Sequence, residues 1–209
     1  MYLRRYAAGN FIITKAKLDT DVYFLVSGKV RSCAFSASGK QVHFEDLDVG
    51  TFFGELAAID EGQRSGECVA MDEVTVGVMS RNDFLDTARR YPVVFDALLR
   101  RLASMVRLQM QRVYELSSCS VNQRIRFELL RLTAEGGGQD SLCSEVKNIQ
   151  SPPTHAEIAT RIGARREAVT RELKKLETSG VITWRRGKHC IHDLTTLMEL
   201  ATSGESLGR

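Results

Sequence analysis

The chain has 209 residues, of which 43% are apolar and 26% charged, with a formal net charge of +3, so it suits one large or two small globular domains. No apolar stretch of about 18 residues and no basic-then-apolar leader occurs, which argues against a membrane span or a signal peptide and favours a cytoplasmic protein. The five cysteines lie more than twenty residues apart, which excludes Cys-x-x-Cys zinc, iron–sulfur and redox motifs and favours packing thiols.

The positive charge is concentrated late in the chain. Residues 1–90 carry 11 Lys and Arg against 13 Asp and Glu, whereas residues 154–188 carry 9 against 4. Such a block is usually a solvated face, but on a compact domain it is also typical of a polyanion binder.

The first part of the chain, from Tyr6 to Met79, has the pattern of short strands separated by turns. Strands are predicted over 22–31, 41–47, 67–71 and 74–79. Many short strands at regular spacing predict a small β-barrel or jelly roll.

A long helix is predicted to begin at Pro92, after a brief helix that Ser80 and Asp83 would cap. Its seam residues alternate four and three apart for three heptads, the 3.5-residue spacing that a partner helix imposes. We therefore expect a homodimer through the helix at 95–116; the alternative is that this face packs on the chain's own barrel. The seam comprises Phe95, Leu99, Leu102, Val106, Gln109, Val113 and Leu116.

Small polar residues at 118–122 interrupt this seam and predict a hinge. A further helix containing Ile125, Leu129, Leu130 and Leu132 follows, and the glycines at 136–138 would end it.

Two short helices joined by a sharp turn are predicted next. Thr154 and Glu157 form a capping box, and Gly163 supplies the turn. The basic stretch 181–192 then has the pattern of a hairpin, so the segment predicts a helix-turn-helix with a wing. The inner faces consist of Ile158, Ala159 and Ile162 in the first helix and Val169, Leu173 and Leu176 in the second.

The opposite face of the second helix carries the chemistry of DNA recognition. Arginine matches guanine O6 and N7, glutamate accepts from the cytosine amino group, and lysine suits phosphates. The alternative for Glu167 and Arg171, four residues apart, is a surface ion pair.

In this order, barrel, long helix and winged helix-turn-helix, residues 6–192 resemble the cyclic AMP receptor protein superfamily, also called the Crp/Fnr family. The resemblance implies an α+β fold with a cyclic-nucleotide-binding β-barrel or jelly roll at 1–91. A dimerisation helix and hinge at 92–120 and a winged helix-turn-helix DNA-binding domain at 121–209 would follow. Its most specific motif is the stretch GELAAIDEGQRSGECVA, beginning at Gly54.

In the family this stretch is the phosphate-binding cassette of the nucleotide pocket. By resemblance, Arg64 would neutralise the cyclic phosphate, Ser65 would donate its hydroxyl to it, and Glu55 would accept from the ribose 2′-hydroxyl. Gly54 and Leu56 would bring backbone close to the ligand. A buried monoanion with one free hydroxyl requires such a set: one planar cation, a few donors and one acceptor.

The base preference stays open at this stage. Alignment places Gln109 and Met110 where the family's dimer helix meets the base, and a glutamine can bond to either purine. The expected effector is therefore cyclic AMP (cAMP) and/or cyclic GMP (cGMP), with no metal, haem or iron–sulfur cluster. The alternative is a Glu55–Arg64 salt bridge in a DNA-binding regulator that is ligand-independent or senses another effector.

The same resemblance implies a palindromic TGTGA-like operator, RNA polymerase as a further partner and a place at the nucleoid. Base contacts would come from Arg166, Glu167 and Arg171. Phosphate contacts would come from Arg165, Thr170, Lys174, Thr154 and His155. No nucleophile–base or metal-ligand constellation lies near the cassette, so we expect no enzyme.

Overall fold

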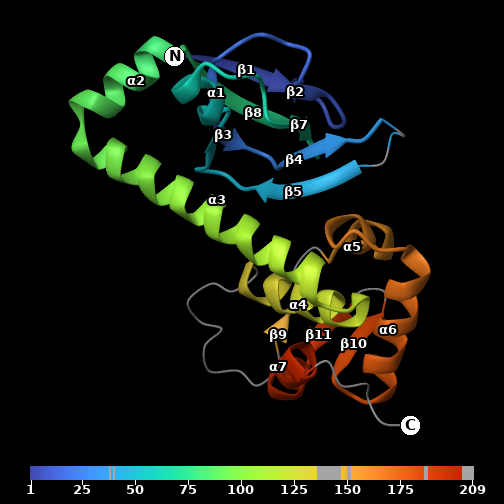
Figure 1. Ribbon diagram of the computed structural model, residues 1–209. Helices are drawn as coiled ribbons and strands as arrows, with labels where there is room; N and C mark the ends of the chain where they lie inside the picture. Colours follow the sequence, from blue (N-terminus) through green and yellow to red (C-terminus); the bar gives the residue numbers. More distant parts are fainter. Residues whose placement is uncertain (38, 40, 136–146, 150–151, 186–187, 204–209) are drawn as a thin grey trace. The chain divides into compact units, whose positions relative to one another are not determined.

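The structure is a computed structural model that describes residues 1–37, 39, 41–135, 147–149, 152–185 and 188–203. It divides into two compact units, Met1–Arg107 and Leu108–Arg209, each described by itself below. The expected fold class is confirmed: a β-rich N-terminal part, a long helix and a C-terminal helix-turn-helix follow one another (Figure 1).

The first unit contains two four-stranded antiparallel sheets, with strand orders β1-β8-β3-β6 and β2-β7-β4-β5. Strands of both sheets alternate buried and more exposed residues, as half-buried strands do. The strands are β1 Tyr2–Tyr6, β2 Phe11–Ile13, β3 Val22–Ser27, β4 Val30–Phe35, β5 Gln41–Leu47, β6 Phe52–Phe53, β7 Glu67–Ala70 and β8 Val74–Met79. The helices are α1 Glu55–Asp60, α2 Arg81–Arg90 and α3 Pro92–Ser118, of which α3 continues into the second unit.

The core of the first unit is formed by residues of both sheets. Val74, Val76 and Val78 of β8 are buried against Tyr23 and Leu25 of β3. A second cluster, built on Phe24, Phe52 and Phe84 with ring centroids 6.0–6.3 Å apart, packs α2 and the start of α3 on the first sheet. Two sheets that share one core agree with the β-barrel or jelly roll expected from the strand spacing.

One expected strand is wrong in its bounds. The stretch 22–31 is two strands, β3 and β4, which belong to different sheets. They are separated at Gly28, which has φ +83° and where a Cβ would lie 2.5 Å from the carbonyl oxygen of Glu73. Only glycine fits this crossing between sheets without strain.

The helix starts predicted from capping residues are confirmed. The Ser80 hydroxyl accepts from the Asp83 N–H (3.2 Å) at the start of α2. Thr154 and Glu157 form the full capping box, and Gly163 adopts φ +64° in the turn that follows.

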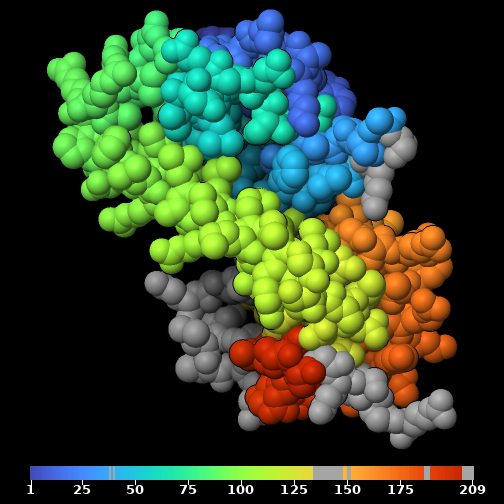
Figure 2. Space-filling model, in the orientation of Figure 1, coloured from blue at the N-terminus to red at the C-terminus, as the bar shows by residue number. Residues whose placement is uncertain are grey.

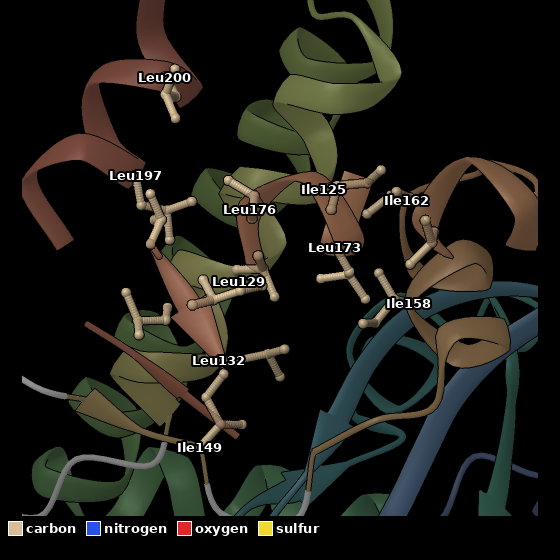
Figure 3. Close-up of a cluster of buried hydrophobic side chains, with 14 of the residues drawn as sticks. Ile125, Leu129, Leu132, Ile149, Ile158, Ile162, Leu173, Leu176, Leu197 and Leu200 are labelled. Atoms are coloured by element: carbon tan, nitrogen blue, oxygen red, sulfur yellow. The ribbon is translucent and has the colours of Figure 1, made fainter. Parts of the chain in front are cut away.

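The described part of the second unit contains a small sheet, with strand order β10-β11-β9, and four helices in addition to the end of α3. Its apolar side chains point toward one another from four helices and the sheet (Figure 3). Of the ten apolar residues that the sequence predicts for three of these helices, nine lie in this core, and Leu130 of α4 packs at its edge. The elements are α4 Val121–Glu135, β9 Lys147–Asn148, α5 His155–Arg161, α6 Arg166–Thr178, β10 Ile182–Arg185, β11 Lys188–Ile191 and α7 Leu194–Ser203.

α3 ends at Ser118 and α4 begins at Val121, so a helix break lies within the predicted hinge at 118–122, and its action as a hinge stays a prediction. Across the break, Arg131 donates to both carboxylate oxygens of Glu115 (2.7 and 3.1 Å), so the last turn of α3 is tied to α4. The glycines at 136–138, expected to end α4, lie outside the described residues. The helix α7 and the strand β9 were not predicted.

The cysteines of the described segments are free, and Cys33, Cys68 and Cys190 are buried. Burial raises the pKa of Cys68 to about 12, so this thiol is protonated at neutral pH. These three behave as packing residues, as expected; Cys143 lies outside the described residues.

A buried ion pair joins three helices of the second unit. Arg126 of α4 donates to Glu172 of α6 (2.8 Å) and to the carbonyl of Leu200 in α7 (2.8 Å), and both charged side chains are at most 2% exposed. A buried pair is costly to break because the remaining charge stays out of water.

We therefore expect Glu172→Gln to lower the free energy of unfolding of the second unit by about 3 kcal/mol. Urea denaturation followed by circular dichroism measures this loss. Glu199→Gln, at an exposed position of α7, is the matched control and should change stability by less than about 0.5 kcal/mol. Equal effects of the two substitutions would contradict the structural role of the pair.

Candidate functional site

The turn between β6 and α1 brings backbone and a guanidinium unusually close together. Gly54 begins α1 with φ +86°, and a Cβ there would lie 2.8 Å from Nη1 of Arg64 and 2.9 Å from the carbonyl oxygen of Asp21. Any larger residue would push the arginine away, so glycine is required by both backbone conformation and space.

Arg64 is buried at this turn, with its side chain only 3% exposed. Its Nη1 donates to the Gly54 carbonyl (2.8 Å) and its Nη2 to the Asp21 carbonyl (2.8 Å). Nε (3.1 Å) and Nη2 also donate to Oδ1 of Asp19. The guanidinium lies 5.9 Å from the centre of the Tyr23 ring. The cation is therefore held rigidly from several sides.

Glu55, the next residue after Gly54, is also buried, at 3% exposed. Burial raises the pKa of its carboxyl, and the nearby charges of Arg101 and Arg64 only partly oppose this shift. Arg101 of α3 makes a bidentate pair with Glu45 of β5 (2.8 and 2.6 Å). Within the described residues, no hydrogen bond of Arg64 goes to Glu55, so the salt bridge weighed as the alternative is not formed.

The structure brings Gly54, Glu55 and Arg64 together in space. Leu56 is half-buried and Ser65 exposed beside them. Gln109 and Met110 are exposed on the part of α3 that belongs to the second unit, and their contact with a base stays a prediction.

Sequence reasoning missed Asp19 and Arg101, which shape the electrostatics of this turn. Asp19 lies 45 positions before Arg64 in a polar loop, and no spacing pattern links the two. Only the packing of the loop after β2 against the cassette places Asp19 beside Arg64.

The helix-turn-helix presents its expected polar face. Arg165, Arg166, Glu167, Thr170, Arg171 and Lys174 are all exposed, while Val169, Leu173 and Leu176 of the same helix are buried. Among the described residues no ion pair joins Glu167 to Arg171, so the surface pair weighed as their alternative role is not formed.

Three of the expected phosphate-contact residues, Thr154, His155 and Thr170, already have partners within the second unit. The Thr154 hydroxyl caps α5, accepting from the Glu157 N–H (3.2 Å). His155 Nδ1 lies 2.9 Å from the Thr170 hydroxyl. Burial, followed by the charge of Arg166, lowers the pKa of His155, so this imidazole is neutral at pH 7.

The hairpin after α6 is an antiparallel pair, with Ile182 opposite Ile191 and Arg185 opposite Lys188. Arg185 of β10 pairs with Glu177 of α6 (3.1 Å), and this contact ties the first strand of the hairpin to α6. The residues at 186–187, where the wing turns, lie outside the described residues.

No cluster of three or more His, Cys, Asp and Glu side chains in the described residues could hold a metal ion. None of the described helices is long and apolar enough to span a membrane.

Comparison with known proteins agrees with this arrangement. Residues 3–91 match the model of the cyclic nucleotide-binding domain, and residues 123–200 match that of the Crp-like helix-turn-helix domain. The cyclic AMP receptor protein of Thermus thermophilus is 30% identical over 95% of this chain and 87% of its own length. The cAMP-activated global transcriptional regulator of Escherichia coli O157:H7 is 27% identical over 87% of this chain and 85% of its own.

A solved structure of a CooA mutant from Carboxydothermus hydrogenoformans has the same fold. It superposes with a TM-score of 0.83 at 18% identity, covering 96% of this chain and 88% of that one. The two matched domains, in this order and over most of the chain, identify the protein as a member of the Crp/Fnr family, a DNA-binding transcription regulator with a cyclic nucleotide-binding domain.

Proposed function

We propose that the protein is a homodimer in which a cyclic purine nucleotide, bound at the cassette, shifts the helix-turn-helix units toward a DNA-binding arrangement. The observation that carries this proposal is the buried Arg64 beside Gly54 and Glu55. A buried cation at a backbone turn, next to a hydroxyl and an acceptor, suits a cyclic phosphate with one free ribose hydroxyl. The names of the relatives, which specify cAMP, support this effector class.

The proposed roles follow from position. Arg64 binds the cyclic phosphate, Ser65 donates its exposed hydroxyl to it, and Glu55 accepts from the ribose 2′-hydroxyl. Gly54 and Leu56 supply backbone near the ligand. Gln109 and Met110 lie at the base and bear on the choice between cAMP and cGMP.

The effector acts by a population shift. A ligand that binds both arrangements equally changes nothing, so the nucleotide must bind the DNA-competent arrangement more tightly. The DNA-competent dimer then reads a palindromic operator, since a two-fold symmetric protein presents two identical helices one to two helical turns apart. RNA polymerase is the further partner that we propose for the DNA-bound dimer.

The α3 seam supports dimerisation. Five of its apolar residues, Phe95, Leu99, Val106, Val113 and Leu116, are 48–63% exposed in the single chain, and Figure 2 shows α3 side chains on the surface. Leu102 instead packs against the cluster around Phe84, so at this one position the alternative of packing on the chain's own domain holds. Exposed residues of this size in a heptad row need a partner helix.

The nucleotide response is tested by titrating a TGTGA-N6-TCACA duplex at fixed salt, without nucleotide, with cAMP and with cGMP. We expect DNA affinity to rise at least about tenfold with one nucleotide, and Arg64→Gln to abolish that rise because the cyclic phosphate loses its cation. Arg89→Gln, an exposed arginine of α2, is the control. Equally tight binding in all three titrations would show a ligand-independent regulator.

The proposed base contacts of α6 are tested by measuring affinity for variants of the operator sequence. Arg171→Ala should reduce discrimination at one base pair by about 1–3 kcal/mol, because the fork that meets guanine is lost. Lys174→Ala should instead weaken binding to all sequences alike and lower the slope of affinity against salt by about one. Identical effects of both substitutions on every sequence would contradict base reading by Arg171.

The dimer is tested at the seam. Val106→Glu would place two carboxylates in the paired seam and should raise the dimer dissociation constant at least about a hundredfold, measured by sedimentation equilibrium. Ser104→Glu adds the same charge at an exposed position off the seam and should leave the dimer intact. A monomeric wild type would refute the dimer outright.

A further inference from the structure

The guanidinium of Arg64 is already engaged by the protein itself. Arginine has five N–H groups, and the hydrogen bonds to Asp19, Asp21 and Gly54 use four of them. The carbonyls of Asp21 and Gly54 are neutral and anchor the cation in place. Asp19 is different, because it supplies a full negative charge and takes two of the four N–H groups.

A cyclic phosphate and the Asp19 carboxylate make the same demand on Arg64. Both are monoanions whose oxygens accept from a guanidinium fork, and charge-assisted bonds of this kind are the strong ones. With one N–H group left over, Arg64 cannot make a forked contact with phosphate while Asp19 keeps its two bonds. The nucleotide and Asp19 therefore compete.

Asp19 has a second cation within reach. Lys17 Nζ lies 2.6 Å from Oδ2 of Asp19, whereas Oδ1 faces Arg64. The Lys17 side chain is 54% exposed and Arg64 is 3% exposed, so the carboxylate bridges from the surface to the buried cation. Two cations and one carboxylate leave a net charge of +1, which one cyclic phosphate neutralises.

We propose that Asp19 is the internal counter-ion that a cyclic nucleotide must displace from Arg64, and that Lys17 holds Asp19 once the phosphate has taken its place. This inference rests on the proposed function of the cassette. With competition of this kind, the apparent affinity equals the intrinsic affinity multiplied by the fraction of molecules in which Arg64 is released. It also selects against neutral nucleosides, which carry no charge to replace that of Asp19.

The arrangement sets a threshold for the effector concentration. Even a nucleotide with high intrinsic affinity occupies the site only when its phosphate displaces the Asp19 carboxylate, which the chain holds beside Arg64. Lys17 lowers the cost of displacement, because Asp19 moves to another cation rather than being left unpaired in a half-buried loop.

The test is isothermal titration of the full-length protein with cAMP and with cGMP. Asp19→Asn keeps an oxygen for Arg64 but removes the competing charge, and should bind the preferred nucleotide at least about tenfold more tightly. Asp21→Asn is the matched control: it removes a charge two residues away, while the Arg64 contact to position 21 uses the backbone carbonyl. Its affinity should stay within about twofold of the wild type.

The second variant addresses Lys17. Lys17→Gln should weaken nucleotide binding by about threefold to tenfold, since the displaced Asp19 then has no partner. Lys15→Gln, at an exposed position of the same loop, controls for loss of a positive charge near the site. Thermal unfolding of each variant confirms that it is folded. If Asp19→Asn does not fold, the Lys17→Gln measurement still tests the proposal.

The outcomes separate the inference from the proposed function. If the wild type binds a nucleotide and Asp19→Asn binds it equally or less tightly, the counter-ion role is refuted and the nucleotide function stands. If only Asp19→Asn binds, the inference holds in its strongest form, with Asp19 closing the natural site and the nucleotide response of the wild type refuted. If no variant binds either nucleotide while operator binding is intact, both proposals fail.

Discussion

The close approach of Arg64 to the backbone at Gly54 is the constraint on which the arrangement of the cassette depends. A guanidinium that is 3% exposed is stable only when its N–H groups are satisfied and its charge is balanced. The carbonyls at positions 21 and 54 accept from its N–H groups, and the Asp19 carboxylate balances its charge. Because glycine at 54 leaves room for the arginine, the turn, the helix α1 and the loop after β2 all meet at one cation.

The second unit relies on buried charge in a different way. Arg126 and Glu172 connect α4 to α6, the helix with the exposed polar face. Glu128 lies between Arg131 (2.9 Å) and Arg161 (3.0 Å). Burial alone would raise the pKa of Glu128, but the neighbouring arginines lower it, so its carboxylate stays charged. Such pairs orient α4, α5 and α6 more specifically than apolar contacts can, because they are satisfied in only one geometry.

Both units contain an arginine paired with a carboxylate, but the surroundings of the two pairs differ. In the second unit, the Arg126–Glu172 pair is buried and ties α6 to α4. In the first unit, the Arg64–Asp19 pair lies at a turn, with Lys17 on the other carboxylate oxygen of Asp19, and we propose that a cyclic phosphate exchanges with Asp19 there. Under this proposal, a structural pair and an exchangeable pair differ in what surrounds the carboxylate rather than in the pair itself.

Local sequence signals determined much of this protein. Capping residues at Ser80 and Thr154, the turn glycine at 163 and the apolar spacing of α5 and α6 act over a few positions, so each could be predicted from the chain and each is confirmed. Family resemblance added the cassette. Tertiary structure alone decided that 22–31 splits between two sheets at Gly28, that Leu102 packs inward, and that Asp19 is the partner of Arg64. These outcomes depend on contacts between residues far apart in the chain, such as the 45 positions between Asp19 and Arg64, and no periodic pattern encodes them.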